Sequence, residues 1–495
     1  MLEEQDIVST SGDQPSTPSA CSTESSAPGV AVPRERDDLT CGTTNEKTWG
    51  IYVYFAADVP DRDMQAAVWS TLGTLASVGS TDSIKITAMI DLPNRNTEYY
   101  ILPPKPSDPN ITRWPILPDR FLANVNSASI DAIQDFFLWS NRNCPADNIA
   151  LVFWGHGYAL DDYDPRIQTK EPRSSRRSAR AGKGRTADSF PGASGKELKL
   201  LYDVTHNSVL NNRDFAQALH ECTQIFTPPK KIQVVGLDCC NMAMAEVLCE
   251  LQDYAEYAVS AETGLPFQSW LSASALEKFL AGKYQTARDF AVNAVEDFIG
   301  SFSHSADTYI ELSACNLNKF GALEAAVKQL VDALLPAIEK YENRRAIAQA
   351  WYHDVSFVPD GLIDLASFCE LLRKYIDPKE NAVISAAAGV QVAVEGARVL
   401  PGVKSTGGVV DLAGVTPNLP GRRISLSRGL SIWFPPWIQF PGVRYFQLKQ
   451  SKDYLFNGYP HMRFATATGW NRLLYELFLL TQSKVISKAI SRRRA

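Results

Sequence analysis

The chain has 495 residues, of which 45% are hydrophobic and 21% are charged, and its formal net charge is −6. These values are typical of a folded protein with a large core, and the negative charge argues against a general nucleic-acid or anionic-membrane binder. The nine cysteines are scattered and form neither a disulfide framework nor a zinc-ligand spacing with the six histidines.

Composition and pattern divide the chain into three parts. Residues 1–46 are rich in Ser, Thr, Pro and Gly with few large apolar side chains, so we expect them to be disordered. Residues 47–310 alternate strand and helix patterns. Residues 311–495 are expected to form a helical and C-terminal α/β portion that ends in a basic tail.

Strand and helix patterns alternate from residue 48 onward, and this alternation predicts a largely parallel sheet covered by helices on both faces. The expected strands are 48–56, 83–91, 94–102, 148–154, 232–237, 259–262 and 430–434. The expected helices are 61–78, 127–142, 212–222 (capped by Asn211), 271–281, 285–303, 317–341, 363–375, 380–398 and 469–482.

Two strand ends carry residues suited to chemistry. The expected strand 148–154 runs into His156, which lies between two glycines. The expected strand 232–237 runs into Asp238-Cys239-Cys240 and then into a helical pattern. Open α/β sheets place ligands at the carboxyl ends of strands, and a thiol at a helix N-terminus would favour thiolate. Buried cysteines at a strand–helix corner and a structural histidine would explain the same residues without chemistry.

The order strand-His156-Gly157, then strand-Asp238-Cys239-Cys240, resembles the clostripain family of cysteine peptidases, relatives of caspases, gingipains and legumain. Similar landmarks occur at 49–58, 259–262, 361–368, 429–435 and 468–470, so the resemblance spans about residues 47 to 480. It implies a caspase-like three-layer α/β/α sandwich with a mostly parallel central sheet, plus helical and C-terminal additions.

The resemblance assigns Cys240 as the nucleophile and His156 as the proton carrier. Successive residues that leave a strand point to opposite sides, so only one of Cys239 and Cys240 can face His156. The family pattern favours Cys240, with Cys239 in the spacer. The resemblance also implies that the backbone N–H groups of Gly157 and Cys240 hold the oxyanion.

By the same resemblance, Asp238 lies in the S1 pocket and selects Arg or Lys at P1, where a carboxylate can pair with a guanidinium. A helix N-cap is the alternative role for Asp238. Relatives often add a second acid in the loop after the 259–262 strand, but residues 263–270 contain none. Glu262 is the nearest acid and is expected to bind substrate as well, with Gln268 as an alternative. The preference between Arg and Lys stays open.

A basic stretch, residues 161–199, interrupts the pattern. Clostripain-like enzymes are cut after the catalytic histidine, so the resemblance implies a self-processing loop. A solvated loop and a nucleic-acid patch are the alternatives, and the lack of aromatic residues weakens the latter. The candidate processing residues are Arg173, Arg176, Arg177, Arg180, Lys183 and Arg185, with Lys170 beside them.

The predicted function is a cysteine endopeptidase that cleaves after Arg or Lys and is made as a self-processed zymogen. No cofactor and no catalytic metal is expected; calcium binding through Asp161, Asp162 and Asp164 is left open, with a solvated turn as the alternative. Expected partners are protein or peptide substrates with a basic P1 residue, and neither nucleic acid nor membrane. We expect a monomer, and a cytoplasmic location because no secretion signal is visible.

Two other functions stay open. One is a caspase-like protease of the same fold, gated by a partner or signal and directed at a dedicated intracellular substrate. The other is a catalytically silent scaffold, although such a protein would have no reason to keep both Cys240 and His156.

Overall fold

The computed structural model describes residues 47–106, 116–157, 199–282, 285–302, 310–358, 361–399, 404–405, 409–410, 422–423, 427–435 and 458–493. Residues Asn45–Ala495 form one compact unit. The expected disordered segment and residues 161–198 of the expected processing loop lie outside the described residues.

A nine-stranded sheet runs through the described part of the unit, in the order β13-β10-β9-β8-β5-β1-β2-β3-β4. Neighbours from β2 through β1, β5 and β8 to β9 pair in parallel, whereas β3, β4, β10 and β13 add antiparallel pairings at the two edges. The strands are β1 (Trp49–Ala56), β2 (Ile84–Asp91), β3 (Thr97–Ile101), β4 (Arg120–Leu122), β5 (Asn148–Trp154), β8 (Ile232–Asp238), β9 (Ala255–Ser260), β10 (Glu311–Asn316) and β13 (Lys404–Ser405).

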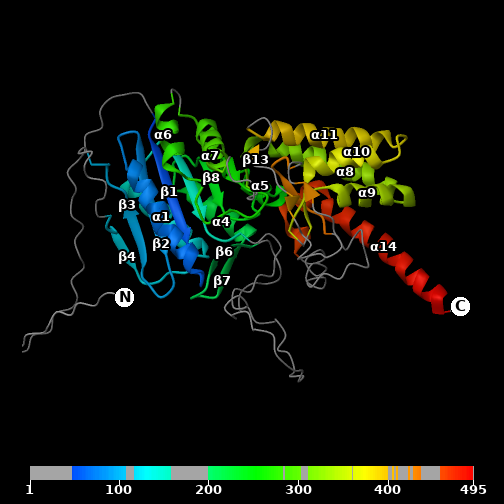
Figure 1. Cartoon of the computed structure of the whole chain (residues 1–495), viewed down its shortest axis with the longest axis horizontal. Helices are drawn as coiled ribbons and strands as arrows, with labels where there is room; N and C mark the ends of the chain where they lie inside the picture. The colour runs from blue at the N-terminus through cyan, green and yellow to red at the C-terminus, as the bar shows by residue number, and fades with distance from the viewer. Residues whose placement is uncertain are drawn as a thin grey trace, which may run out of the picture. The chain divides into compact units, whose positions relative to one another are not determined.

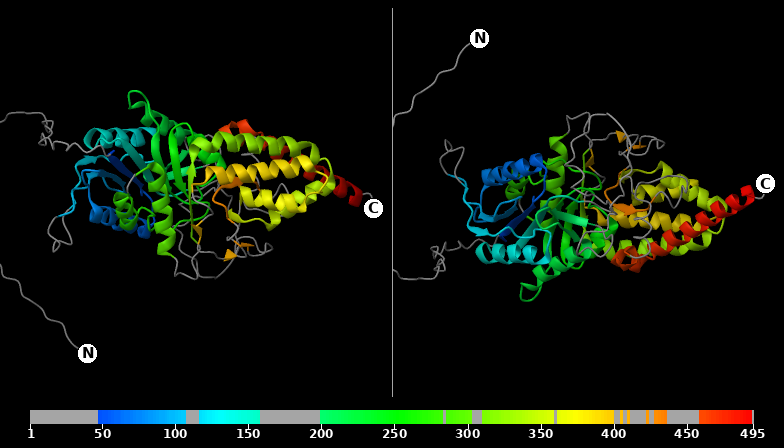
Figure 2. Two further views of the ribbon diagram at one scale, coloured as in Figure 1. Left: turned by 90° about the horizontal axis from the view of Figure 1, so that it is seen from above. Right: turned by 90° about the horizontal axis from the view of Figure 1, so that it is seen from below.

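Both faces of this sheet are covered by helices (Figures 1 and 2). All eight residues of β1 are buried, and they alternate between two cores: Ile51 and Val53 belong to one, Tyr52 and Tyr54 to the other. The first core includes α1 (Arg62–Val78), α6 (Ala273–Ala281) and α7 (Ala287–Ser301); the second includes α2 (Ile130–Asn143), α4 (Asn212–Gln224) and α5 (Ala245–Leu251). The expected three-layer α/β/α arrangement is confirmed.

The C-terminal elements extend the second core rather than building a separate one. Helices α8 and α11, α10 and α11, and α9 and α10 pack against one another. Strand β10 pairs with β9 of the central sheet, whereas β11, β12 and β16 form a separate three-stranded sheet. These elements are η1 (Leu317–Lys319), α8 (Phe320–Ala337), α9 (Tyr341–His353), β11 (Ser356–Val358), β12 (Leu362–Asp364), α10 (Leu365–Tyr375), α11 (Asn381–Ala397), β14 (Val409–Val410), β15 (Arg422–Arg423), β16 (Ser431–Trp433), η4 (Tyr459–His461), α13 (Arg463–Thr468) and α14 (Trp470–Arg493).

Among the elements that the sequence prediction did not include are the strand β10, the helix α9 and a hairpin formed by β6 (Lys199–Asp203) and β7 (Ser208–Asn211). Helix α4 begins as expected, because the Asn211 side chain accepts a hydrogen bond from the Asp214 N–H.

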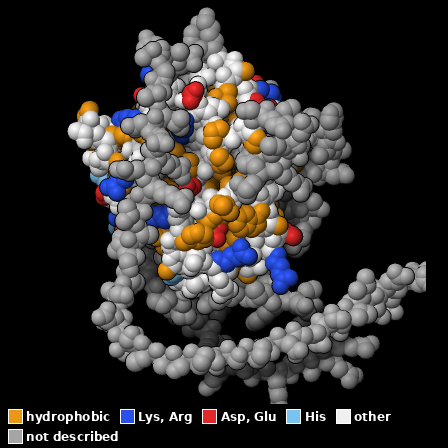
Figure 3. Space-filling view, turned by 90° about the vertical axis from the view of Figure 1, so that its left-hand side faces the viewer, with side chains coloured by type: hydrophobic (Ala, Val, Ile, Leu, Met, Phe, Trp, Pro, Cys, Tyr) orange, Lys and Arg blue, Asp and Glu red, His pale blue; other side chains and the backbone are white. Residues whose placement is uncertain are grey.

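The β3–β4 edge carries exposed hydrophobic side chains. Phe121 on β4 is 59% exposed, and Leu117 just before the strand is 74% exposed. Figure 3 looks onto this end of the molecule, where hydrophobic and basic side chains lie side by side. Across the described residues, every helix is too short or too polar to cross a membrane.

Candidate active site

The two expected motifs lie at adjacent strand ends. Strand β5 pairs in parallel with β8, and Trp154 at the end of β5 is the partner of Asp238 at the end of β8. His156 and Cys240 therefore each follow a paired residue by two positions. The sheet brings the histidine and cysteine segments together at its carboxyl edge, where α/β folds place their chemistry.

Gly157 sets how closely these two segments approach. A Cβ atom at this position would lie 2.2 Å from the carbonyl oxygen of Cys240, 2.9 Å from Cγ of Met242 and 3.1 Å from Cβ of Cys239. The backbone that follows His156 therefore packs directly against the Cys240 carbonyl group, and only glycine leaves room for that contact.

We expect Gly157→Ala to lower the thermal stability and to remove most of the peptidase activity, because the clash is with backbone and cannot be relieved by a side-chain rotation. Overpacking of this kind costs roughly 1–3 kcal/mol. Gly73→Ala is the matched control, since no atom lies within 4 Å of a Cβ atom there. Thermal melts and peptide hydrolysis measure both effects, and a Gly157→Ala enzyme with wild-type values would contradict the close approach.

The structure separates the two neighbouring cysteines. Cys239 is buried, and its Sγ donates a hydrogen bond to the Phe153 carbonyl at 3.5 Å. Cys240 is partly exposed, and its Sγ accepts a hydrogen bond from the Leu265 N–H at 3.2 Å. Of the two, Cys240 is the thiol that a substrate could reach, which supports the predicted choice without testing it.

The expectation that these cysteines begin a helix is wrong. Helix α5 starts at Ala245, with Met244 as its N-cap residue, so Cys240 lies outside the reach of the helix dipole and Asp238 is no N-cap. Asn241 takes a left-handed conformation with φ of 58°, and its N–H donates to the Thr263 carbonyl. The chain turns sharply after Cys240 instead of winding into a helix.

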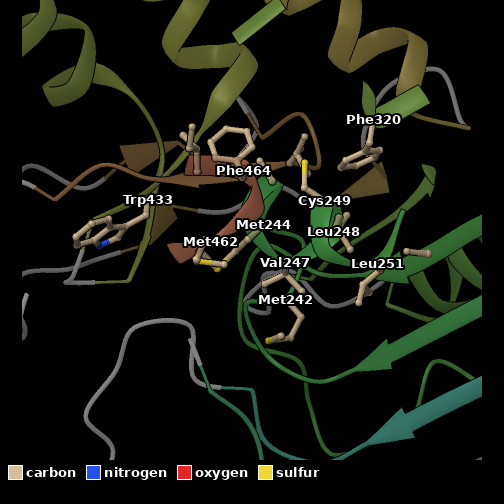
Figure 4. Packing of buried hydrophobic residues seen from close by; sticks show 14 of the residues in the cluster. Met242, Met244, Val247, Leu248, Cys249, Leu251, Phe320, Trp433, Met462 and Phe464 are labelled. Atoms are coloured by element: carbon tan, nitrogen blue, oxygen red, sulfur yellow. The ribbon is translucent and has the colours of Figure 1, made fainter. Parts of the chain in front are cut away.

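The residues beyond this turn anchor it to the second core. Met242 and Met244 pack beside Val247 and Leu248 of α5, with Trp433 and Met462 from the C-terminal elements in the same cluster (Figure 4). Burial of the apolar residues from Met242 to Leu248 fixes the turn at Cys240 against this core. The C-terminal portion therefore supports the site structurally.

The loop 263–270 lies against Cys240. Its Leu265 N–H bonds the thiol, and its far end is fixed by Trp270, whose ring fills the space over Gly236 of β8. A Cβ atom at Gly236 would lie 2.6 Å from the Trp270 ring. Leu265 was not singled out by the sequence, because its contact with Cys240 depends on this anchoring.

Asp238 is fully surrounded by protein. Its carboxylate accepts a hydrogen bond of 2.5 Å from the Ser269 hydroxyl, and burial raises its pKa to about 7 despite that bond. Ser269 and Gln268 also line a cavity of about 440 Å³ between the loop and α1. This cavity includes neither Cys240 nor His156 among its lining residues, so it lies beside the reacting groups rather than over them.

Glu262 lies elsewhere than expected. Its carboxylate is fully buried and accepts hydrogen bonds from the Ser427 hydroxyl and from the Gly429 N–H, the latter at 2.8 Å. Burial, together with the nearby Asp364 and Glu311 carboxylates, raises the pKa of Glu262 well above its usual value. The structure places this side chain in an internal carboxylate cluster, where it offers no exposed oxygen to a substrate.

His156 is held by the β6–β7 hairpin. Its carbonyl accepts a hydrogen bond of 3.0 Å from the Leu201 N–H, and Gly157 forms an isolated bridge with Leu200. Burial lowers the pKa of His156 to about 4, and the Asp61 carboxylate opposes this shift. Burial raises the pKa of Cys240, with the Leu265 N–H acting against it. Both groups are therefore neutral near pH 7 in this state.

The remaining predicted residues cannot be placed. The candidate processing residues and the candidate calcium ligands Asp161, Asp162 and Asp164 all fall within 158–198, outside the described residues. Nothing in the sequence indicated that Asp61 influences His156. Its side chain caps α1 by accepting hydrogen bonds from the Asp63 and Met64 N–H groups, and the fold brings its carboxylate near enough to His156 to raise the pKa of the imidazole.

A mostly parallel sheet covered on both faces, with a cysteine and a histidine at neighbouring strand ends, is the arrangement that the resemblance to caspase-like cysteine peptidases implied. The clostripain family model matches residues 193–395 and confirms the resemblance to that family over this segment. The matched segment contains Asp238 and Cys240 but begins after His156.

The fold is similar to that of solved C11 cysteine proteases. One is a secreted protease from Bacteroides thetaiotaomicron in complex with an irreversible peptide inhibitor, with 15% identity, a TM-score of 0.55, and coverage of 86% of this chain and 99% of the other. Another is an inactive zymogen from Parabacteroides distasonis, with 14% identity, a TM-score of 0.54, and coverage of 86% and 99%. A search of curated proteins finds no match. At these identities the likeness shows the fold alone.

Proposed function

We propose that the chain is an endopeptidase that cleaves after a basic residue by a Cys240–His156 pair and is processed in the basic stretch after the histidine. The observation that carries this proposal is the β5–β8 register, in which each of these residues follows the pair Trp154–Asp238 by two positions. Proteins and peptides are the substrates of such an enzyme.

The chemistry begins with two neutral groups. The Cys240 thiol attacks the scissile carbonyl while its proton passes to the imidazole of His156, and the N–H groups of Gly157 and Cys240 receive the developing oxyanion. The tetrahedral intermediate collapses, and the leaving amine takes the proton from His156. Water then attacks the thioester, and His156 again relays the proton. No cofactor is needed for any of these steps.

Asp238 supplies the proposed selectivity for a basic P1 residue. It lies two residues before Cys240, and in the part of the chain that the structure describes its carboxylate accepts hydrogen bonds from the neutral hydroxyl of Ser269 and from the Trp270 backbone. A buried carboxylate without a cationic partner would pair favourably with a guanidinium or ammonium group. The proposal therefore relies on Asp238 and no longer on Glu262.

The ends of the basic stretch support self-processing. Gly157 before it and Leu200 after it form a bridge with each other, and Gly157 contacts the Cys240 backbone. A segment whose two ends are held beside the thiol has a high effective concentration at the site. Its basic side chains are those that the Asp238 pocket would accept.

We expect the chain to remain in one piece when the basic residues from 170 to 185 are all replaced by Gln, because that segment then has no basic residue that could bind at Asp238 as P1. Ser174→Ala with Ser175→Ala in the same stretch is the matched control and should still be cut. Gel analysis, intact mass and N-terminal sequencing of the fragments read the result. Continued cleavage between residues 170 and 185 in the Gln variant would contradict processing at basic residues.

A further inference from the structure

Three carboxyl groups meet in the interior, at the start of the loop 263–270. Glu262 immediately precedes that loop, Glu311 begins β10 and Asp364 ends β12, and all three are fully buried. The Glu262 N–H donates to the Glu311 carboxylate at 2.6 Å, and the Asp364 carboxyl group lies within hydrogen-bonding reach of the Glu262 side chain. Three acids from distant parts of the chain therefore share one buried site, and the proposed peptidase chemistry uses none of them.

The hydrogen bonds of this cluster call for bound protons. In the described part of the chain, Oε1 of Glu262 and Oε1 of Glu311 have no hydrogen-bond donor. Two carboxyl groups can bond to each other only when one of them carries a proton, because an ionised carboxylate is an acceptor alone. A proton on Glu262 lets its carboxyl group donate to Asp364, and it removes a buried charge at the same time.

Positive charge near the cluster does not replace these protons. Arg398 lowers the pKa of Asp364, but its guanidinium also pairs with Glu395. The Arg428 side chain bonds Glu370 instead, at 3.4 Å. An arginine that is shared with a further acid cannot neutralise three buried carboxylates.

The pKa directions agree with bound protons. Burial raises the pKa of Glu311 to about 8, with Asp364 adding to the shift and the Glu262 N–H opposing it. Burial also raises the pKa of Asp364 to about 6 and that of Glu262 well above its usual value. Cys315 of β10, the other titratable group beside these acids, has a raised pKa as well, so its thiol stays neutral and adds no charge.

We propose that Glu262, Glu311 and Asp364 share bound protons in the folded chain, and that these protons hold the start of the loop 263–270 in place. When a proton leaves, like charges face each other in a buried site and push the three segments apart. The proposal concerns the order of the loop and does not depend on the proposed peptidase mechanism.

The start of the loop is tied to the turn after Cys240. The Asn241 N–H donates to the Thr263 carbonyl at 2.9 Å, and the Leu265 N–H bonds the Cys240 thiol at 3.2 Å. Glu262 is the residue before Thr263, so a shift of the Glu262 backbone loosens both contacts. The carboxyl cluster therefore makes the order of the backbone around Cys240 depend on pH.

The direction of this dependence follows from the raised pKa of Glu311. An ordinary glutamate has a pKa of 4.5, so the stability that Glu311 contributes is complete below that pH and is lost as the pH rises through about 8. Between these two values, each pH unit should raise the opening equilibrium of the loop roughly tenfold for each proton released.

The test uses the full chain as Cys240→Ala, so that self-cleavage cannot interfere. Thermal melts and amide hydrogen exchange of the segment 241–265 are measured at several pH values from about 5 to about 8, with exchange rates corrected for the faster chemistry of free amides at high pH. We expect the protection of the Asn241 and Glu262 amides to fall roughly 10²-fold over two pH units in this range.

Glu311→Gln resembles the protonated side chain and keeps an acceptor for the Glu262 N–H. This variant should melt like its parent near pH 5 and at a higher temperature near pH 8, and it should keep more of the amide protection there. The exposed Glu277→Gln is the matched control and should retain the pH dependence of the parent. The same pH dependence in Glu311→Gln as in the parent, or constant protection in the parent, would overturn the proposal.

Asp364→Asn is a second variant that keeps the test decisive if Glu311→Gln fails to fold. Asn retains an acceptor for the Ser367 N–H, which the Asp364 side chain caps at the start of α10. Because the pKa of Asp364 is about 6 and its ordinary value is 3.8, this variant should remove part of the fall in protection below about pH 6. An unchanged fall in that range would count against the shared protons.

Discussion

Replacing Cys240 by Ala should abolish both peptide hydrolysis and self-cleavage, with a loss in kcat on the order of 10⁴-fold or more, because the nucleophile has no substitute. The fold should persist, since Cys240 is only partly buried and lies outside the regular helices and strands. Hydrolysis of a small arginyl amide and intact mass after incubation measure the two activities.

Cys239→Ala is the matched control for this prediction. Cys239 is buried and bonded to the Phe153 carbonyl, so its loss should lower stability slightly while the enzyme still cleaves. The reverse outcome, an active Cys240→Ala and an inactive Cys239→Ala, would show that Cys239 is the nucleophile. Inactivity of the wild type toward every small substrate would favour the partner-gated protease or the silent scaffold.

Asp238→Asn should lower kcat/KM for an arginyl substrate roughly 10²-fold, because a charge-assisted hydrogen bond in a buried site is lost. Hydrolysis of a substrate with a neutral P1 residue should change far less. Glu262→Gln is the matched control: it removes another buried carboxylate, one whose contacts are to Ser427 and Gly429, and it should leave the preference for arginine unchanged. An altered preference in Glu262→Gln would restore Glu262 as a pocket residue.

The pH profile provides a second test of Asp238. Its pKa is raised to about 7 in the folded enzyme, so the carboxyl group takes up a proton, and loses its charge, as the pH falls through this value. For an arginyl substrate, kcat/KM should therefore fall below about pH 7, and the fall should vanish in Asp238→Asn. His156 cannot produce this step, because its pKa is about 4. If kcat/KM for the arginyl substrate still falls below about pH 7 in Asp238→Asn, Asp238 has only a structural role.

The sheet and most of its helices could be predicted because their signals are local. Strand β1 is buried along its whole length, and helix α1 spans Arg62–Val78, close to the expected 61–78. The positions of His156 and Cys240 follow from the same logic, since parallel strands end at one edge of a sheet.

What the sequence could not show depends on contacts between distant segments. The apolar spacing after Cys240 resembled a continuous helix, but Asn241 and Ala243 instead donate backbone hydrogen bonds to residues 263 and 261. Glu262 was taken for a pocket residue because the partners that bury it, Ser427 and Gly429, lie far along the chain. The carboxyl cluster that Glu262 forms with Glu311 and Asp364 is invisible in sequence for the same reason.

The most direct test of the central claim is to label the enzyme with an irreversible peptidyl inhibitor that carries Arg at P1, and to locate the adduct by peptide mass mapping. The account predicts one adduct per chain on Cys240 in the wild type and in Cys239→Ala, and weaker labelling in Asp238→Asn. An adduct on Cys239, or no adduct on an enzyme that cleaves arginyl substrates, would contradict the assignment of Cys240 as the nucleophile.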